Sequence, residues 1–477
     1  MAGVLAGKKV IVIGTGIGGS GVSALLAKEG ADVLVLERNA FAGGKSASFE
    51  REGFIYDSGV HWLARGERGP LGEIAAKVGA DLKFRTLQEG VQFGLGGRAV
   101  TLPTHMDDED SMKGFFCDLG VCPEKIPGAW SFFEDVMREK SEVELAELDG
   151  LSLTDYVSRF VSDGQFEKLI EAFAGIYMVI GPRQSSAGEF ILCLSTHIRE
   201  KSLSYPLGGM RAIPLAYLKA TEDCGGEVRY GSPVQHIVVE KGRVRGVVAG
   251  GFIAADIVIS NTGLKETVEL AGRRNFPVPY LEMVDNLRLS YGAVSVKYAL
   301  DAEIVKPHVI FYYPDTSKTA LAERQAAVFI PVPSAADPSL APPGCQMALA
   351  ASLVPSGLEN PREADRICEW VIQRIENTMR DLFPDIERHV VWKIRTNTRT
   401  IAELSGRRTG EVVGLAQNRH QVGRNRPKNE TPVEGLFLVG ADTGGRGVGT
   451  EMAADSALNL WRILKDYRAP FALSLSI

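Results

Sequence analysis

Residues 8–19, Lys-Lys-Val-Ile-Val-Ile-Gly-Thr-Gly-Ile-Gly-Gly, decide the fold of this 477-residue chain. Their apolar, β-branched first half has the length of a buried strand, and the second half fits G-x-G-x-x-G. A helical pattern follows and ends at Gly30, and a second strand at 32–36 delivers Glu37. Strand, glycine turn, helix, strand and acid in this order predict a Rossmann-like unit that binds a dinucleotide.

The residue types in this unit suit the phosphates and ribose of a dinucleotide. Gly14 allows the tight turn, Gly16 lets the backbone approach a pyrophosphate, and Gly19 lets the helix pack close to the strand. A helix follows the turn, and its free N–H groups and dipole favour phosphate, so Ile17 and Gly18 are also expected to contact the cofactor. Glu37 lies at the tip of the second strand, where it can accept hydrogen bonds from ribose hydroxyls.

The residues after Glu37 indicate which dinucleotide is bound. Residues 38–46 read Arg-Asn-Ala-Phe-Ala-Gly-Gly-Lys-Ser. An acid followed by Gly-Gly and a basic residue resembles the FAD-binding start of the large flavoprotein family that includes amine oxidases, phytoene desaturases and Rab GDP-dissociation inhibitors. The resemblance implies FAD as the cofactor and places five residues near it: Arg38, Gly43, Gly44, Lys45 and Ser46. An ordinary loop is the alternative interpretation of the glycine pair.

Composition limits the remaining possibilities. The chain is too long for one core, and its 45% apolar and 23% charged residues are ordinary for a globular protein. The net charge of −6 gives no reason to expect a nucleic-acid partner. We expect no signal peptide or membrane span, and the scattered cysteines suit a reducing cytoplasm. A metal site at His105, Cys117 and Cys122 is a weak alternative, because no second pair of ligands matches it.

A second resemblance concerns residues 53–62, Gly-Phe-Ile-Tyr-Asp-Ser-Gly-Val-His-Trp. They resemble the phytoene desaturase element Gly-Phe-x-Phe-Asp-x-Gly-Pro, which passes near the flavin ring. Gly59 and Val60 are therefore expected near the cofactor, although Val60 stands where that family has proline. The histidine that follows is similar to a version of the element in retinol saturase and related carotenoid isomerases. His61 is thus a candidate catalytic group, and a structural role is its alternative.

Two further segments extend this resemblance. Residues 205–239 resemble the family pattern Tyr-Pro-x-Gly-Gly, helix, Gly-Gly, strand, Val-x-x-Ile. The resemblance implies that Val234 contacts adenine and that Tyr205, like His61, is a candidate catalytic residue on the reactive side of the flavin. A strand at 254–261 ends on Asn261, at the edge where ligands gather in open α/β sheets, although a polar strand cap explains this asparagine equally well.

The C-terminal part supplies the third predicted cofactor contact. A strand at 435–440 ends on a glycine and an acid, a glycine loop follows, and a helix is expected over 450–465. The helix N-terminus should stabilise the negative charge of a reduced flavin. Residues expected at the cofactor here are Gly440, Asp442, Gly447, Val448, Gly449, Thr450 and Met452.

The segments between these motifs predict a second domain. Residues 104–203 have helical patterns and resemble the cap that covers an apolar substrate, with Gly181-Pro182 ending one helix. Residues 94–97 are expected to form a hairpin turn. Residues 287–400 alternate short strands with a long helix at 361–382, and the loop 333–343 is expected to be a mobile surface turn.

Together these observations predict an α/β fold in which a Rossmann-like FAD-binding domain of the glutathione-reductase type (1–100, 205–285 and 405–477) is interleaved with an α+β substrate and cap domain (101–204 and 286–404). The resemblance implies an FAD-dependent oxidoreductase of the phytoene desaturase and retinol saturase family. Its expected substrate is a long apolar, isoprenoid-like molecule, and its expected electron partner is a quinone, oxygen or another carrier. We expect cytoplasmic location with possible peripheral membrane contact. An amine or steroid oxidase, and a non-catalytic isoprenoid-binding protein, are the alternatives.

Overall fold

A five-stranded parallel sheet carries the predicted nucleotide-binding unit. The computed structural model describes residues 5–59, 62–86, 91–95, 98–201, 203–313, 327–358 and 360–467. The sheet has the order β19-β13-β1-β2-β9, with the bounds β1 (Lys9–Ile13), β2 (Asp32–Leu36), β9 (Glu227–Arg229), β13 (Ile257–Ser260) and β19 (Leu436–Leu438). The central strand β1 pairs with β2 on one side and β13 on the other. The predicted order of strand, turn, helix and strand is confirmed.

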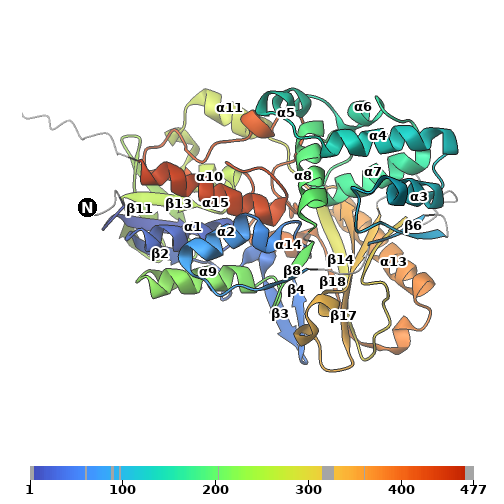
Figure 1. The fold of residues 1–477 in the computed structure, drawn as a ribbon. Coiled ribbons are helices and arrows are strands. Elements are labelled where there is room, and N and C mark those ends of the chain that lie inside the picture. The colour runs from blue at the N-terminus through green and yellow to red at the C-terminus, as the bar shows by residue number, and fades with distance from the viewer. Residues whose placement is uncertain are drawn as a thin grey trace, which may run out of the picture.

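Both faces of this sheet are covered, as its near-continuous apolar strands require. Val10 and Val12 of β1 pack against the helices α1 (Ile17–Lys28), α2 (Pro70–Val78), α9 (Ala212–Asp223) and α15 (Gly449–Lys465). Ile11 and Ile13 face the other way, toward a small antiparallel sheet and two helices: β10 (His236–Glu240), β11 (Arg243–Val248), β12 (Phe252–Ala254), α10 (Leu264–Ala271) and α11 (Val278–Asn286). These layers form the left half of the molecule in Figure 1.

A seven-stranded sheet forms the second half. Its order is β18-β14-β17-β16-β15-β6-β7, with the bounds β6 (Gln92–Leu95), β7 (Arg98–Thr101), β14 (Gly292–Leu300), β15 (Val309–Tyr313), β16 (Val328–Pro331), β17 (Gln346–Val354) and β18 (Val390–Thr396). Val294, Val296 and Tyr298 of β14 pack against the long helix α13 (Pro361–Leu382), as predicted. The antiparallel pairing of β6 with β7 agrees with the expected hairpin, although 96–97 lie outside the described residues. The predicted segment 1–100 therefore includes strands that belong to this second sheet.

Six helices form a cap over the end of the seven-stranded sheet that carries β6 and β15 (Figure 1). Their bounds are α3 (Glu109–Leu119), α4 (Ile126–Met137), α5 (Glu142–Asp149), α6 (Leu153–Val157), α7 (Gly164–Tyr177) and α8 (Ala187–Glu200). Its core is rich in aromatic side chains, including Phe132 and Phe166, whose rings lie 5.7 Å apart. The predicted helical block is confirmed, but α7 ends at Tyr177, before Gly181-Pro182, and Val179 then adopts a positive φ of 54°.

Two further antiparallel strand pairs and a short helix lie outside the two large sheets. One two-stranded antiparallel sheet pairs β3 (Ser48–Arg51) with β4 (Phe54–Asp57), and another pairs β5 (Phe84–Thr86) with the sequence-distant β8 (Ser204–Pro206). The prediction of a surface turn at 333–343 is wrong, because α12 (Pro333–Ala336) forms there and Leu340 is fully buried. Its Asp337 accepts a hydrogen bond from the Gly208 backbone at 2.6 Å. Across the described part of the chain, none of the helices combines the length and apolar character that a membrane crossing requires.

Candidate functional site

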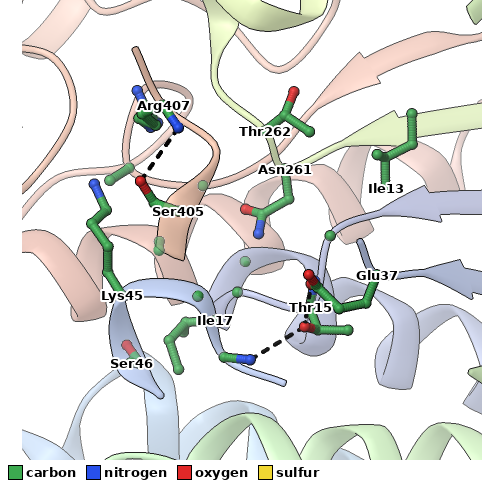
Figure 2. Close-up of a pocket in the computed structure, with 18 of the residues that line it drawn as sticks. Ile13, Thr15, Ile17, Glu37, Lys45, Ser46, Asn261, Thr262, Ser405 and Arg407 are labelled. Carbon is green, nitrogen blue, oxygen red and sulfur yellow. Dashed lines mark hydrogen bonds between the residues drawn. The ribbon is translucent and has the colours of Figure 1, made fainter. Parts of the chain in front are cut away.

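A cavity of about 300 Å³ lies at the carboxyl ends of β1, β2 and β13, where ligands bind in open α/β sheets (Figure 2). It brings together the glycine turn, the segment after β2 and the C-terminal glycine loop, although these lie far apart in sequence. Fifteen of the residues predicted to contact a cofactor line it: Gly14, Gly16, Ile17, Gly18, Glu37, Arg38, Gly43, Gly44, Lys45, Ser46, Val234, Asn261, Gly440, Gly449 and Thr450.

The glycine turn is closely packed against its neighbours. A Cβ atom on Gly16 would lie 2.6 Å from the end of the Asn261 side-chain amide, and one on Gly18 would lie 2.9 Å from the Gly440 backbone. Gly19 does not line the cavity, but its Cβ would lie only 2.1 Å from the Gly14 carbonyl oxygen. At each of these three positions, a side chain would collide with neighbouring protein atoms. This agrees with the predicted roles of close backbone approach at Gly16 and helix–strand packing at Gly19.

Glu37 is fixed at the rim of this turn by three hydrogen bonds. Its Oε2 accepts from the Thr15 backbone N–H at 2.9 Å and from the Thr15 hydroxyl at 2.6 Å. Its Oε1 accepts from the Asn39 backbone N–H at 2.9 Å. A carboxylate offers about four lone-pair positions, so this geometry leaves acceptor capacity for a ligand hydroxyl. Glu37 thus holds the turn and faces the cavity at the same time (Figure 2).

Asn261 connects the glycine turn to the C-terminal segment. With its amide oxygen toward the turn, it accepts from the Gly16 N–H at 3.2 Å and donates to the Val439 carbonyl at 3.1 Å. These two bonds fit the strand-capping alternative. Asn261 also lines the cavity, and its contact with the cofactor stays a prediction.

Two cations, Lys45 and Arg407, line one wall of the cavity, and two carboxylates lie behind Arg407. Arg407 lines it and is paired at 2.9 Å with Asp442 and at 3.0 Å with Glu411. Burial opposes the charge of Arg407, but these two carboxylates raise its pKa. Lys45 donates to the Glu411 carbonyl at 3.1 Å, and desolvation together with Arg407 lowers the pKa of Lys45 to about 8. The wall can therefore offer positive charge to an anionic ligand.

Asp442 is held by partners within the protein, and its predicted contact with the cofactor stays a prediction. Its carboxylate is occupied by Arg407 and by the backbone N–H groups of Leu264 at 3.0 Å and Leu415 at 3.1 Å, and it does not line the cavity. Burial raises the pKa of Asp442, but Arg407 and these donors hold it below its ordinary value. In this structure Asp442 positions Arg407, and Arg407 is the residue exposed to the cavity.

The C-terminal loop is shared between the cavity and the cap. Gly449 and Thr450, at the start of α15, line the cavity. The three other residues predicted here do not: Gly447 donates its N–H to Glu189 of the cap at 2.8 Å, Val448 packs against the cap core, and Met452 is fully buried.

Of the two candidate catalytic residues, His61 and Tyr205, the structure describes only Tyr205. His61 and Val60 lie outside the described residues, so their placement stays a prediction. Gly59 lies close to Lys45, since a Cβ atom on Gly59 would be 2.9 Å from the Lys45 carbonyl oxygen. Tyr205 is 1% exposed and donates its hydroxyl to Asp57. Burial raises the pKa of both groups, and the Tyr205 hydroxyl is engaged by Asp57, so the catalytic role of Tyr205 stays a prediction.

Several cavity residues were missed by the sequence patterns. They are Ile13, Thr15, Leu36, Asn39, Pro233, Thr262, Leu270, Leu404, Ser405, Arg407, Val412, Val413, Ala441 and Ala453. Thr15 could have been found, because it occupies the variable position of the glycine motif itself. Arg407 and its neighbours carry no motif, and only the fold brings them to the cavity.

The alternative metal site does not form. Cys117 and Cys122 are exposed free thiols, and His105 instead contacts Lys201 at 3.0 Å. In the parts of the chain that the structure describes, no three histidine, cysteine, aspartate or glutamate side chains come together as metal ligands.

These residues fit an FAD molecule. The turn and the start of α1 offer backbone N–H groups to a pyrophosphate, Glu37 offers an acceptor to a ribose, and Lys45 and Arg407 offer positive charge. Gly16 and Gly18 both line the cavity, so the backbone of the turn is open to a ligand there.

Comparisons with known proteins agree with this fit. The model of the flavin containing amine oxidoreductase family matches residues 22–460. The prolycopene isomerase of Daucus carota is 25% identical, with 90% of this chain and 75% of that protein covered. A phytoene desaturase of Fusarium fujikuroi is 26% identical, with 96% of this chain and 90% of that protein covered. The fold resembles the crystal structure of an oxidoreductase from Methanosarcina mazei, with a TM-score of 0.76, 22% identity and coverage of 95% and 100%.

Proposed function

Since the chain belongs to the flavin containing amine oxidoreductase family, it is an FAD-dependent oxidoreductase, and we propose that it desaturates, saturates or isomerises carbon–carbon bonds of a long apolar, isoprenoid-like substrate. The supporting observation is the extent of the similarity. The relatives named prolycopene isomerase and phytoene desaturase align with 90% and 96% of this chain, so the similarity includes most of the cap and substrate sheet as well as the cavity.

The proposed cofactor residues are those that line the cavity. The first turn of α1 binds the pyrophosphate, Glu37 holds the ribose, and Val234 lies at the adenine end. The N-terminus of α15, at Gly449 and Thr450, favours negative charge on the flavin ring. When bound, FAD supplies hydride exchange with one carbon of the substrate.

The proposed substrate region lies where the cap meets the other elements. Apolar side chains that are only partly buried pack there against the cap core, among them Trp62, Ile176, Tyr291, Phe329 and Val448. Val448 directly precedes the cavity residue Gly449, which connects this region to the cofactor end. Such side chains can exclude water and bind a long apolar molecule, and binding sites are commonly lined in this way.

A paired variant tests the substrate region. Ile176 and Ile126 both pack, partly buried, against the same cap core. Ile176 follows Gly175, which faces Leu353 of the substrate sheet, whereas Ile126 begins α4 within the cap. We expect Ile176→Ser to raise KM for an isoprenoid by about tenfold, the loss typical of reduced apolar contact, and Ile126→Ser to leave KM unchanged. Equal KM values in both variants would remove the support for this region.

The reaction itself is tested with the FAD-loaded protein. Poly-cis and all-trans carotenoids in liposomes are offered to the oxidised and to the chemically reduced protein, and products are separated by chromatography. We expect either desaturation by the oxidised form, with a quinone or oxygen accepting the two electrons, or saturation by the reduced form, whose flavin supplies them, or isomerisation by the reduced form with no net electron transfer. Stimulation by liposomes would support peripheral membrane contact. Hydrogen peroxide release with amines, and no conversion of isoprenoids, would instead identify an amine oxidase.

His61 is our proposed proton-transferring or substrate-orienting group. Its imidazole can exchange a proton near neutral pH, and a positioned acid–base group contributes about 10²–10⁴-fold to a rate. We expect His61→Gln to bind FAD normally and to slow single-turnover flavin reduction or oxidation at least about tenfold. An unchanged rate would make His61 structural.

A further inference from the structure

The start of α15 is held from outside its own domain. The loop before it contains Arg446 and Gly447, and both donate to Glu189 of the cap helix α8, at 2.8 Å each. Glu189 is fully buried, and it is stabilised by its position in the first turn of α8, whose N-cap is Ser186. In Figure 1, α8 lies between the other cap helices and α15.

Gly447 makes the contact with Glu189 specific. Its φ of 107° is accessible to glycine and strained for other residues, so the loop has an unusual conformation at this point. The Glu189 carboxylate bonds the backbone N–H of Gly447 with Oε1 and the guanidinium of Arg446 with Oε2. One carboxylate therefore fixes two consecutive residues, Arg446 and Gly447. The second of these lies two positions before the cavity residue Gly449.

Asp149 provides a natural comparison within the same cluster. It also lies in the cap, at the end of α5, and pairs with Arg446 at 2.7 Å. The Asp149 carboxylate also accepts from the hydroxyl of Ser186 at 3.3 Å, whereas the Glu189 carboxylate accepts from the loop backbone at Gly447. The two acids share one arginine and one buried environment, with side-chain exposures of 6% for Asp149 and 0% for Glu189. They differ in the bond to the Gly447 N–H.

We propose that Glu189 is a positioning residue that fixes loop 446–449 in the conformation in which the first turn of α15 meets FAD. The carboxylate acts through Gly447 and does not touch the cofactor. Because the same side chain belongs to the cap, FAD binding and order in α5 and α8 depend on each other. Coupling of this kind is reciprocal, so each binding or ordering event favours the other. The inference rests on FAD as cofactor and is independent of the proposed substrate.

The test compares Glu189→Gln with Asp149→Asn. Each replacement keeps the size of the side chain and removes one negative charge beside Arg446, but only Glu189→Gln alters the acceptor of the Gly447 N–H. FAD is titrated into each apo-protein, and flavin fluorescence gives Kd. We expect Kd to rise at least about tenfold in Glu189→Gln and to stay within about threefold of wild type in Asp149→Asn. The visible flavin spectrum should shift only in Glu189→Gln.

Hydrogen exchange supplies a second measurement that does not depend on activity. FAD should protect amides in 142–149 and 187–200 of the wild-type protein, and this protection should be lost in Glu189→Gln and kept in Asp149→Asn. Equal Kd values and equal protection in the two variants would overturn the proposal.

If Glu189→Gln does not fold, Glu189→Asp is used in its place. It keeps the charge but is one methylene shorter, so it cannot reach Arg446 and Gly447 together. We expect the Kd of Glu189→Asp for FAD to be higher than that of wild type, and a wild-type Kd would overturn the proposal. Since no substrate is used, failure to convert isoprenoids has no effect on either result.

Discussion

Replacement of Glu37 by glutamine is expected to lower FAD affinity about tenfold. Hydrogen bonds to a charged acceptor contribute about 1.5–3 kcal/mol and those to a neutral one about 0.5–1.5 kcal/mol. Loss of the charge facing the ribose therefore costs about 1.4 kcal/mol, which is a factor of ten in Kd. The assay is titration of the apo-protein with FAD, followed by flavin fluorescence.

The same variant has a separate effect on the apo-protein. An amide retains one acceptor oxygen, which can serve both Thr15 donors, but its NH₂ group then faces the Asn39 N–H. One buried donor without a partner costs about 1–3 kcal/mol of unfolding free energy. Thermal unfolding of the apo-protein measures this loss independently of FAD.

A Thr15→Val variant separates the two roles of Glu37. It removes the hydroxyl that donates to Glu37 at 2.6 Å but leaves the carboxylate charged. We expect a less stable apo-protein whose Kd for FAD is within about threefold of wild type. If Glu37→Gln loses stability and keeps the wild-type Kd, Glu37 only shapes the turn and the ribose assignment is refuted. Glu37→Arg, which lacks any acceptor, should not retain FAD.

Three further predictions follow from the site. Gly19→Ala should prevent FAD retention, seen as colourless purified protein, because its Cβ would lie 2.1 Å from the Gly14 carbonyl oxygen; a yellow protein would contradict this. The pKa of Lys45 is about 8 in the folded protein against 10.5 ordinarily, so the unfolded state binds more protons between these values and the stability of the apo-protein gains from rising pH there. Lys45→Met should remove up to about 1 kcal/mol per pH unit of this gain between pH 8 and 9 in urea unfolding, and an unchanged slope would place the titration elsewhere. FAD should be bound non-covalently, so acid precipitation should leave a colourless pellet and a yellow supernatant; a pellet that stays yellow would show a covalent bond.

The sequence predicted the parts of this molecule in which local order and function coincide. Residues 8–37 form the expected strand, turn, helix and strand, because each element is specified by its own periodicity and by glycines at fixed positions. The long helix at 361–382 was also predicted with its observed bounds, since its apolar face repeats over six turns and Asn360 and Pro361 mark its start.

Contacts between distant segments could not be predicted in the same way. Asp442 follows a strand that ends at the cavity, and only the three-dimensional pairing with Arg407 shows that the acid turns away from it. Residues 333–343 have the composition of a surface loop, but their burial depends on contact with β17 and with Gly208. The composition of such a segment shows which of its residues interrupt helices and strands. It does not show which other segments of the chain pack over it.

The interleaved strand order has a consequence for how the chain is made. The central strand β1 is synthesised first, its neighbour β13 near the middle, and the outer strand β19 close to the end. At about 5–20 residues per second, roughly 20–90 s separate β1 from β19 during translation. The β6–β7 hairpin likewise leaves the ribosome long before β15, its parallel partner. Through this interval the nascent chain exposes strand edges with no partner yet made, which gives chaperones a defined period in which to bind it.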